Sequence, residues 1–344
     1  MKLLLYSDIH ISRTSSILPL VDSKNKDLTC RQQMLLDTSK WICELAQEHQ
    51  VDAIINLGDT LDQHTITSYD IKILNEFFKN IQNVVVPHYV LLGNHEKLNN
   101  TYNAIELLQN INGVTIITEP TTLYDGLLAF LPYYDKVETL PKGEFLFSHN
   151  DIQGSVLRGN ILLEKGIEVD SLKDYKVVFN GHIHKSSRMN NIINVGSTTT
   201  HSFSDDNEQV PKCYIFDTDT LELTPYENTC CPLFRSIEIE TIDELKTVIE
   251  NLDNRFKYVL KVTLSYDISE ESKMILLNSD KLTTFKLVTK MVSKPEQVSL
   301  LENKAMLNDS RSTNLNIIDK FNQFINTIET QYPKELYFKI TKVL

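Results

Sequence analysis

The sequence lacks any segment that is apolar enough to span a membrane, and it lacks a disulfide framework. Nothing approaches 18 uninterrupted apolar residues, and the apolar run 1–5 is too short for a secretory signal. The five cysteines include no Cys-x-x-Cys pair, and Cys230 and Cys231 are adjacent, which favours reduced thiols. Internal repeats and low-complexity segments are missing as well. We therefore expect a soluble, cytoplasmic protein.

The sequence also lacks an excess of basic residues. Its net charge is −12. The whole excess of acidic residues falls on residues 1–230, which contain 18 Lys and Arg against 30 Asp and Glu, whereas residues 231–344 contain 16 of each. A stand-alone nucleic-acid binder normally has a basic footprint, so the acidic part argues against that class. It suits a site that concentrates divalent cations. If the substrate is a polyanion, metals or a basic partner must supply much of the attraction.

The order of apolar patterns predicts a layered α/β protein. A length of 344 residues favours one large and one small domain. Strand-like and helical patterns alternate through the first hundred residues, and short strands follow. A segment with a proline near each end, residues 224–234, is the candidate linker. We expect a large domain over 1–226, a small α/β domain over 232–295 and a C-terminal helix over 311–332.

Polar residues that can bind metals stand at the ends of the apolar runs in the large domain. In layered α/β folds the carboxyl ends of strands line one edge, where ligands bind. Imidazole, carboxylate and amide oxygen together suit metals such as Mn, Fe or Zn, and two such ions can clamp both oxygens of a phosphoryl displacement. The strand-end motifs are Asp8-x-His10, Gly58-Asp59, Gly93-Asn94-His95-Glu96, His149 and Gly181-His182-x-His184.

This ordered set of motifs resembles the calcineurin-like metallophosphoesterase superfamily, whose fold is a four-layer α/β/β/α sandwich. The resemblance implies two bound divalent ions, Mn²⁺ or alternatively Mg²⁺. It implies that Asp59 bridges them and that His95 is the catalytic imidazole, which contacts the phosphate and helps the leaving oxygen. Asn94 and His95 are neighbours on an extended segment and must point opposite ways. The implied ligands are Asp8, His10, Asp59 and His184 for the first ion, and Asp59, Asn94, His149 and His182 for the second.

A second stretch narrows the resemblance to nucleases. Residues 193–208 are similar to the Gly-Ser…Ser-Phe stretch that follows Gly-His-x-His in SbcD-type nucleases, the catalytic subunits of DNA break-processing complexes. In that family a small α/β capping domain and a helical region follow, and the short chain is closer to phage recombination subunits. The resemblance implies an exonuclease on duplex ends and an endonuclease, paired with an SMC-like (SbcC-type) ATPase as a homodimer within a heterotetramer. A viral origin would place it in the host cytoplasm.

The C-terminal region carries the expected partner contact. Within residues 312–331, Ile317, Phe321, Phe324 and Ile328 form an apolar stripe at helical spacing. SbcD-like nucleases use C-terminal helices to grip the coiled-coil base of the ATPase, which implies the same role here. The alternative is that this helix folds back on its own capping domain.

Several positions and functions stay open from the sequence. The motifs depart from the common SbcD pattern at Ile11-Ser12, Ser148 and Thr198, and Asp62 stands where some relatives have a functional His. A stand-alone phosphatase or nucleotidase of small phosphoesters is the alternative function; an inactive scaffold would lack ligands, and no ligand is missing. The candidate DNA or phosphate contacts are His64, Lys185, Arg188 and His201. For each of them the alternative is an ordinary surface or structural role.

Overall fold

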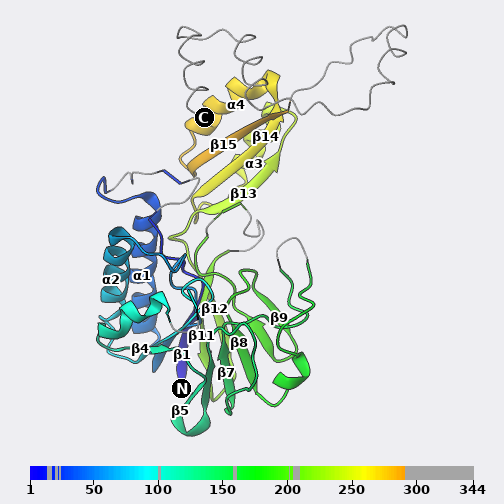
Figure 1. Ribbon diagram of the computed structural model, residues 1–344. Helices are drawn as coiled ribbons and strands as arrows, with labels where there is room; N and C mark the ends of the chain where they lie inside the picture. Colours follow the sequence, from blue (N-terminus) through cyan, green and yellow to red (C-terminus); the bar gives the residue numbers. More distant parts are fainter. Residues whose placement is uncertain are drawn as a thin grey trace, which may run out of the picture. The chain divides into compact units, whose positions relative to one another are not determined.

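Figure 1 shows the computed structural model of the protein. The structure describes residues 1–13, 18–19, 22, 25–99, 102–157, 161–200, 202–203 and 210–290. Two expectations lie outside these residues: the candidate contact His201, and the C-terminal helix with Ile317, Phe321, Phe324 and Ile328. Residues 1–291 form one compact unit.

The first sheet has the strand order β12-β11-β1-β2-β3-β4, and its four strands β1 to β4 are parallel. Helices α1 (Cys30–Glu48) and α2 (Ser68–Ile81) pack on one face of this sheet. Each begins at a capping box, Thr29 with Gln32 and Thr67 with Asp70, which satisfies backbone N–H groups of the first turn. The strands are β1 (Lys2–Tyr6), β2 (Ala53–Asn56), β3 (His88–Leu91), β4 (Val114–Ile117), β11 (Lys212–Asp217) and β12 (Leu223–Glu227).

The second sheet packs against the other face of the first and has the order β5-β6-β7-β8-β10-β9. Five phenylalanines, at 130, 145, 147, 179 and 216, lie in the core between the sheets. Alternate residues of β1 enter different cores: Leu4 faces the helices, whereas Leu3 and Leu5 face the second sheet. The strands of the second sheet are β5 (Thr121–Leu123), β6 (Leu128–Leu131), β7 (Phe145–Ser148), β8 (Val177–Asn180), β9 (Ser187–Met189) and β10 (Ile192–Asn194).

The outer face of the second sheet is covered differently from the first. Ala129, Leu146 and Val178 on this face pack against Leu172, which belongs to a short 3-10 helix, Val169–Leu172. Over this face the described chain is otherwise irregular. The predicted α/β class with stacked layers is confirmed, and short 3-10 and irregular segments form the outer layer where the resemblance implied α-helices. Other short 3-10 helices among the described residues are η1 (Ala104–Asn110), η2 (Tyr124–Gly126) and η5 (Tyr266–Ile268).

A third, three-stranded parallel sheet follows in the sequence, with the order β13-β14-β15. It consists of β13 (Leu233–Glu238), β14 (Tyr258–Ser265) and β15 (Leu282–Lys290), with α3 (Ile242–Glu250) and α4 (Ser269–Leu277). Leu245 and Leu276 from the two helices share an apolar core with β14. In the described part of the chain, no helix has the length and apolarity needed to cross a bilayer.

One buried histidine leads to a stability prediction. His88 on β3 is 4% exposed, and its Nε2 lies 2.9 Å from the Tyr6 hydroxyl. Burial lowers the pKa of His88 from 6.5 to about 3. The folded protein therefore binds fewer protons than the unfolded chain between these two pH values. The contribution of His88 to the free energy of unfolding falls with falling pH, by at most about 1.4 kcal/mol per pH unit.

We expect His88→Gln to reduce this acid sensitivity, because glutamine cannot be protonated but can reach the Tyr6 hydroxyl. The measurement is urea unfolding of wild type and His88→Gln, with metals chelated. It is repeated at several pH values between roughly 4 and 7, the range over which the lowered pKa of His88 acts on stability. The matched control is His64→Gln, since His64 is exposed. A free energy of unfolding that falls equally steeply in wild type and His88→Gln contradicts the prediction.

Candidate metal centre

The structure brings all the predicted ligands to the same edge of the stacked sheets. Asp8 and His10 follow β1, Asp59 follows β2, and Asn94 follows β3, all from the first sheet. The second sheet supplies the rest from parallel strands: His149 directly follows β7, and His182 and His184 follow β8. The carboxyl ends of the two sets of strands therefore meet at this edge, as ligand sites of layered α/β folds do.

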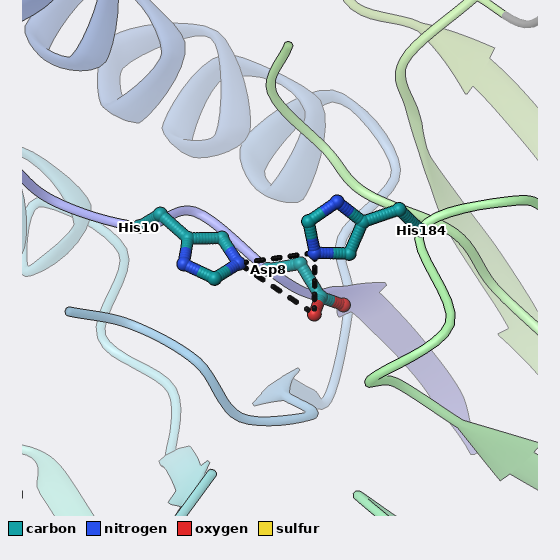
Figure 2. Close-up of side chains that lie close together, drawn as sticks. All are labelled: Asp8, His10 and His184. Carbon is teal, nitrogen blue, oxygen red and sulfur yellow. Dashed lines mark hydrogen bonds and ion pairs between the residues drawn. The ribbon is translucent and has the colours of Figure 1, made fainter. Parts of the chain in front are cut away.

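A first cluster consists of Asp8, His10 and His184 (Figure 2). The Nε2 atoms of His10 and His184 lie 3.2 Å apart. Asp8 Oδ1 lies 3.9 Å from His10 Nε2 and 3.7 Å from His184 Nε2. Asp8 and His10 are buried, whereas the side chain of His184 is 31% exposed. Two ring nitrogens and a carboxylate oxygen thus point at one small volume.

A second cluster consists of Asp59, His149 and His182, with Asn94 between the two histidines. His149 Nε2 lies 3.3 Å from Asp59 Oδ2 and 3.2 Å from Asn94 Oδ1. His182 Nδ1 lies 2.9 Å from the same amide oxygen. Asp59 also joins a group with His10 and His95, because its Oδ2 is 3.8 Å from His10 Nε2. Asp59 therefore belongs to the second cluster and also lies close to His10 of the first.

In His149 and His182, the ring nitrogen that faces away from the cluster forms a hydrogen bond, and this bond determines whether the nitrogen that faces the cluster carries a proton or a lone pair. His149 Nδ1 donates a hydrogen bond to the Leu57 carbonyl (2.7 Å), and His182 Nε2 donates one to Asp151 Oδ1 (3.0 Å). In the neutral imidazoles the inner nitrogens therefore present lone pairs toward Asn94 Oδ1, which is itself an acceptor. Acceptors that converge at these distances repel one another unless a proton or a metal ion lies between them. The donor set fits a divalent metal ion with N and O ligands.

The titration behaviour agrees with this donor set. Burial alone would raise the pKa of Asp59, but His149, His10 and His95 outweigh it and hold that pKa below its usual range. Burial alone would lower the pKa of His149, but the charge and hydrogen bond of Asp59 raise it to about 9. Without a metal a proton thus supplies the positive charge, and binding of a metal releases such protons. Burial, with the charge of Asp59 added, raises the pKa of Glu96 to about 8.

The backbone at the site explains the glycines of the motifs. A Cβ on Gly58, whose φ is +110°, would lie 2.4 Å from His149 Nδ1, and a Cβ on Gly93 would lie 2.1 Å from Asp59 Oδ1. No side chain fits at either position. Several ligands are themselves in the left-handed region, a conformation that non-glycine residues keep only when their surroundings enforce it. These are Asp8 (φ 53°), His10 (φ 48°), Asp59 (φ 49°) and His182 (φ 67°).

His95 lies beside the clusters and opens to solvent. Its Nδ1 is 2.6 Å from the backbone oxygen of Asp62, and its Nε2 is 3.9 Å from Asp59 Oδ2. Its side chain is 39% exposed, and its ring meets that of His10 edge-on at 4.6 Å. Asn94 contacts the opposite group, His149 and His182. The imidazole is thus held at the rim of the cluster, where a substrate phosphate can reach it.

The remaining candidates lie outside the clusters. His64 and Arg188 are exposed and Lys185 is half-buried, and the structure places none of them in the three metal-ligating groups of the described residues. Sequence reasoning missed Asp151, whose contact with His182 orients that ring. The available signal was its position two residues after His149 in the motif His-x-Asp. It also missed the buried Arg31, for which the sequence offers no signal.

The fold and the site define a metal-dependent phosphoesterase. Residues 1–186, more than half of the chain, match the family of calcineurin-like phosphoesterases, and the chain belongs to this family. The strand-end ligands fall within that match, and the resemblance derived from the motifs is confirmed at the level of the family.

Two relatives are similar to this chain over different lengths. Exonuclease subunit 1 of Enterobacteria phage T4 is 24% identical over 340 residues, which cover 89% of this chain and 93% of the phage protein. The SbcD subunit of the nuclease SbcCD from Escherichia coli (strain K12) is 33% identical over 92 residues, which cover 27% of this chain and 22% of the bacterial protein. A solved archaeal phosphodiesterase aligns with 66% of this chain and 99% of its own, at 17% identity and a TM-score of 0.36.

Proposed function

We propose that this protein is a two-metal DNA nuclease that acts as an exonuclease on duplex ends and as an endonuclease. One observation carries the proposal: Asp59 belongs to one cluster of N and O ligands and lies 3.8 Å from His10 of the other, and the imidazole of His95 lies beside both. The similarity to the phage exonuclease subunit over 89% of the chain supports DNA as the substrate.

Each residue has a distinct role in this proposal. Asp8, His10, Asp59 and His184 would hold the first ion, and Asp59, Asn94, His149 and His182 the second. When bound, two such ions, Mn²⁺ or Mg²⁺, would supply an activated water and stabilise negative charge on the phosphate. The Asp62 carbonyl accepts from His95 Nδ1 and fixes the ring. In the imidazolium form of His95, Nε2 carries the second ring proton; it would contact the phosphate and pass this proton to the leaving oxygen, which leaves the ring neutral.

A direct comparison of substrates tests the function. We expect the full chain with Mn²⁺ to degrade linear duplex DNA, more slowly with Mg²⁺, and to lose activity when the metals are chelated. Closed circular duplex is the matched control, because it lacks ends and reports endonuclease cleavage alone. Rapid hydrolysis of p-nitrophenyl phosphate with both DNA substrates left intact would instead support the stand-alone phosphatase or nucleotidase.

The proposed assembly includes an SMC-like, SbcC-type ATPase. The sequence supports this through the apolar stripe of residues 312–331, which lies outside the described residues. Burial of its phenylalanines on a partner would contribute roughly 1.5–3 kcal/mol each before ordering costs. We expect Phe321→Glu with Phe324→Glu to abolish co-purification with the ATPase and to spare Mn²⁺-dependent cleavage by the isolated chain. Loss of folding by circular dichroism, or continued co-purification, would contradict this docking role.

We also propose that the protein forms a homodimer through an exposed apolar patch. Ile71, Leu98, Tyr102 and Leu107 are between 38% and 65% exposed and line a hollow of about 540 Å³. Contiguous exposed apolar side chains of this kind mark interaction sites, and a two-fold dimer uses one patch twice. Since the resemblance implies a homodimer, a second copy of this chain is the proposed occupant.

Charging this patch is expected to separate the copies. Tyr102→Glu with Leu107→Glu should give a monomer by light scattering coupled to size exclusion, with unchanged circular dichroism. The matched control is Ile161→Glu with Leu162→Glu, since these residues are 63% and 60% exposed but lie elsewhere. A wild-type protein that is still monomeric at roughly 100 μM would refute the dimer, because specific dimers have dissociation constants below that concentration.

A further inference from the structure

Arg31 is a buried arginine directly behind the first metal cluster. It is the second residue of α1 and is 1% exposed. Its Nη2 donates to the backbone oxygens of Ile9 (2.8 Å) and His10 (2.9 Å). Its Nη1 donates to the Thr200 oxygen (2.8 Å). Burial of a guanidinium costs free energy unless hydrogen bonds compensate it, so a fully buried arginine indicates a specific structural role.

The carbonyls that Arg31 binds belong to a strained segment. Asp8 and His10 both have left-handed backbone angles, with the β-branched Ile9 between them. A conformation of this kind persists only when its surroundings determine it. Arg31 contributes two of the bonds that do so, and the loop after β10 contributes others: Ser197 Oγ donates to the Asp8 oxygen (2.9 Å) and Thr199 Oγ1 to the Ile9 oxygen (3.0 Å).

The same guanidinium ties this segment to the loop that faces it. Thr200, which accepts from Nη1, donates its own hydroxyl to the Pro232 oxygen (2.7 Å), one residue before β13. Two nitrogens of one planar group thus bind two segments, Ile9–His10 and Thr200, that lie far apart in the chain. A lysine ammonium is a point donor and cannot reproduce this fork geometry.

We propose that Arg31 is a positioning residue for the first metal site: it holds the backbone of Ile9 and His10 so that the His10 imidazole meets Asp8 and His184. This inference rests on the proposed ligand role of His10. The second site has supports of its own, because His149 is oriented by Leu57 and His182 by Asp151. Loss of the guanidinium therefore weakens the first site selectively. Groups that orient metal ligands typically contribute about 10- to 100-fold in metal affinity.

The test measures metal binding by the full chain, so it does not depend on nuclease activity. Wild type, Arg31→Met, Arg31→Lys and His10→Ala are titrated with Mn²⁺ by calorimetry, and electron paramagnetic resonance distinguishes a coupled pair of ions from a single ion. For Arg31→Met we expect one site weakened by about 10- to 100-fold, the other within about twofold of wild type, and the signal of a single ion. Arg31→Lys should lie between Arg31→Met and wild type.

Two comparisons keep the outcomes distinct. The control is Ile42→Ala, because Ile42 is in the same helix and fully buried. This variant should have a lower unfolding temperature and still bind two Mn²⁺ ions. If it loses the first site to the same extent, the effect of Arg31 is one of general stability and the inference is overturned. If His10→Ala loses one ion but Arg31→Met binds two with native affinity, Arg31 does not position the site. If His10→Ala still binds two ions, the proposed ligand set itself fails. Should Arg31→Met not fold, native affinity in Arg31→Lys overturns the inference.

Discussion

Replacement of His95 with alanine is expected to reduce cleavage of duplex DNA by about 10²- to 10⁴-fold, the usual contribution of a positioned acid or base. The imidazole is held by the Asp62 carbonyl at 2.6 Å and lies at the rim of the cluster with its side chain 39% exposed. It can therefore act on a phosphate and its leaving oxygen, whereas its neighbour Asn94 points among the ligands. Two bound ions should remain in the variant.

The measurement pairs initial rates on linear duplex DNA with the Mn²⁺ stoichiometry of the same preparation. His49→Ala is the control, because His49 lies at the C-terminal end of α1 and belongs to none of the metal-ligand clusters of the described residues. Full activity of His95→Ala at normal metal content would remove His95 from the mechanism. Loss of an ion in that variant would show that His95 is a ligand and would overturn its proposed role on the phosphate.

Asp59→Asn is expected to weaken both metal sites together, more than any other single change of a ligand. The Oδ2 atom of Asp59 lies 3.3 Å from His149 Nε2 and 3.8 Å from His10 Nε2, so this carboxylate is within reach of histidines from both clusters. Asparagine removes the negative charge. Its Oδ1 can still accept from the His95 backbone N–H, a bond of 3.0 Å in the native protein. The fold should therefore survive while affinity at each site falls by more than about 100-fold, beyond the effect of an orienting group.

The comparison variant is His184→Ala, which removes a ligand of the first cluster only. Calorimetry with Mn²⁺ should show one site lost in His184→Ala and both lost in Asp59→Asn. Circular dichroism without metals checks that both variants fold. An Asp59→Asn protein that still binds one ion with native affinity would exclude the bridging role.

Much of the site could be predicted because the signal is local. A strand that is buried on both faces appears as a continuous apolar run, and the ligand motif follows it at the carboxyl end. The alternation of strand and helical patterns then predicts parallel strands whose ends meet. These relations hold within about ten residues of chain, and the structure shows them at β1, β2 and β3. The helix caps at Thr29, Thr67 and Thr241 are equally local, and the sequence shows the last of these as a capping box.

Other features depend on contacts that no local pattern encodes. The outer face of the second sheet has the same apolar alternation as one that α-helices cover, so the short 3-10 helix at Val169–Leu172 could not be foreseen.

The sequence by itself determined the layered α/β class, the order of the ligand motifs and the chemical types of the ligands, because periodicity and side-chain chemistry are properties of short segments. Only the tertiary structure decided that ligands from two sheets converge, that Asp151 contacts His182 and that Arg31 on α1 donates to the backbone oxygen of His10 after β1. The physical reason is that hydrogen bonds between segments 20 to 170 residues apart (roughly the span of these contacts) form only after the sheets stack. The direction in which each ligand side chain points is therefore fixed only when both sheets are in place.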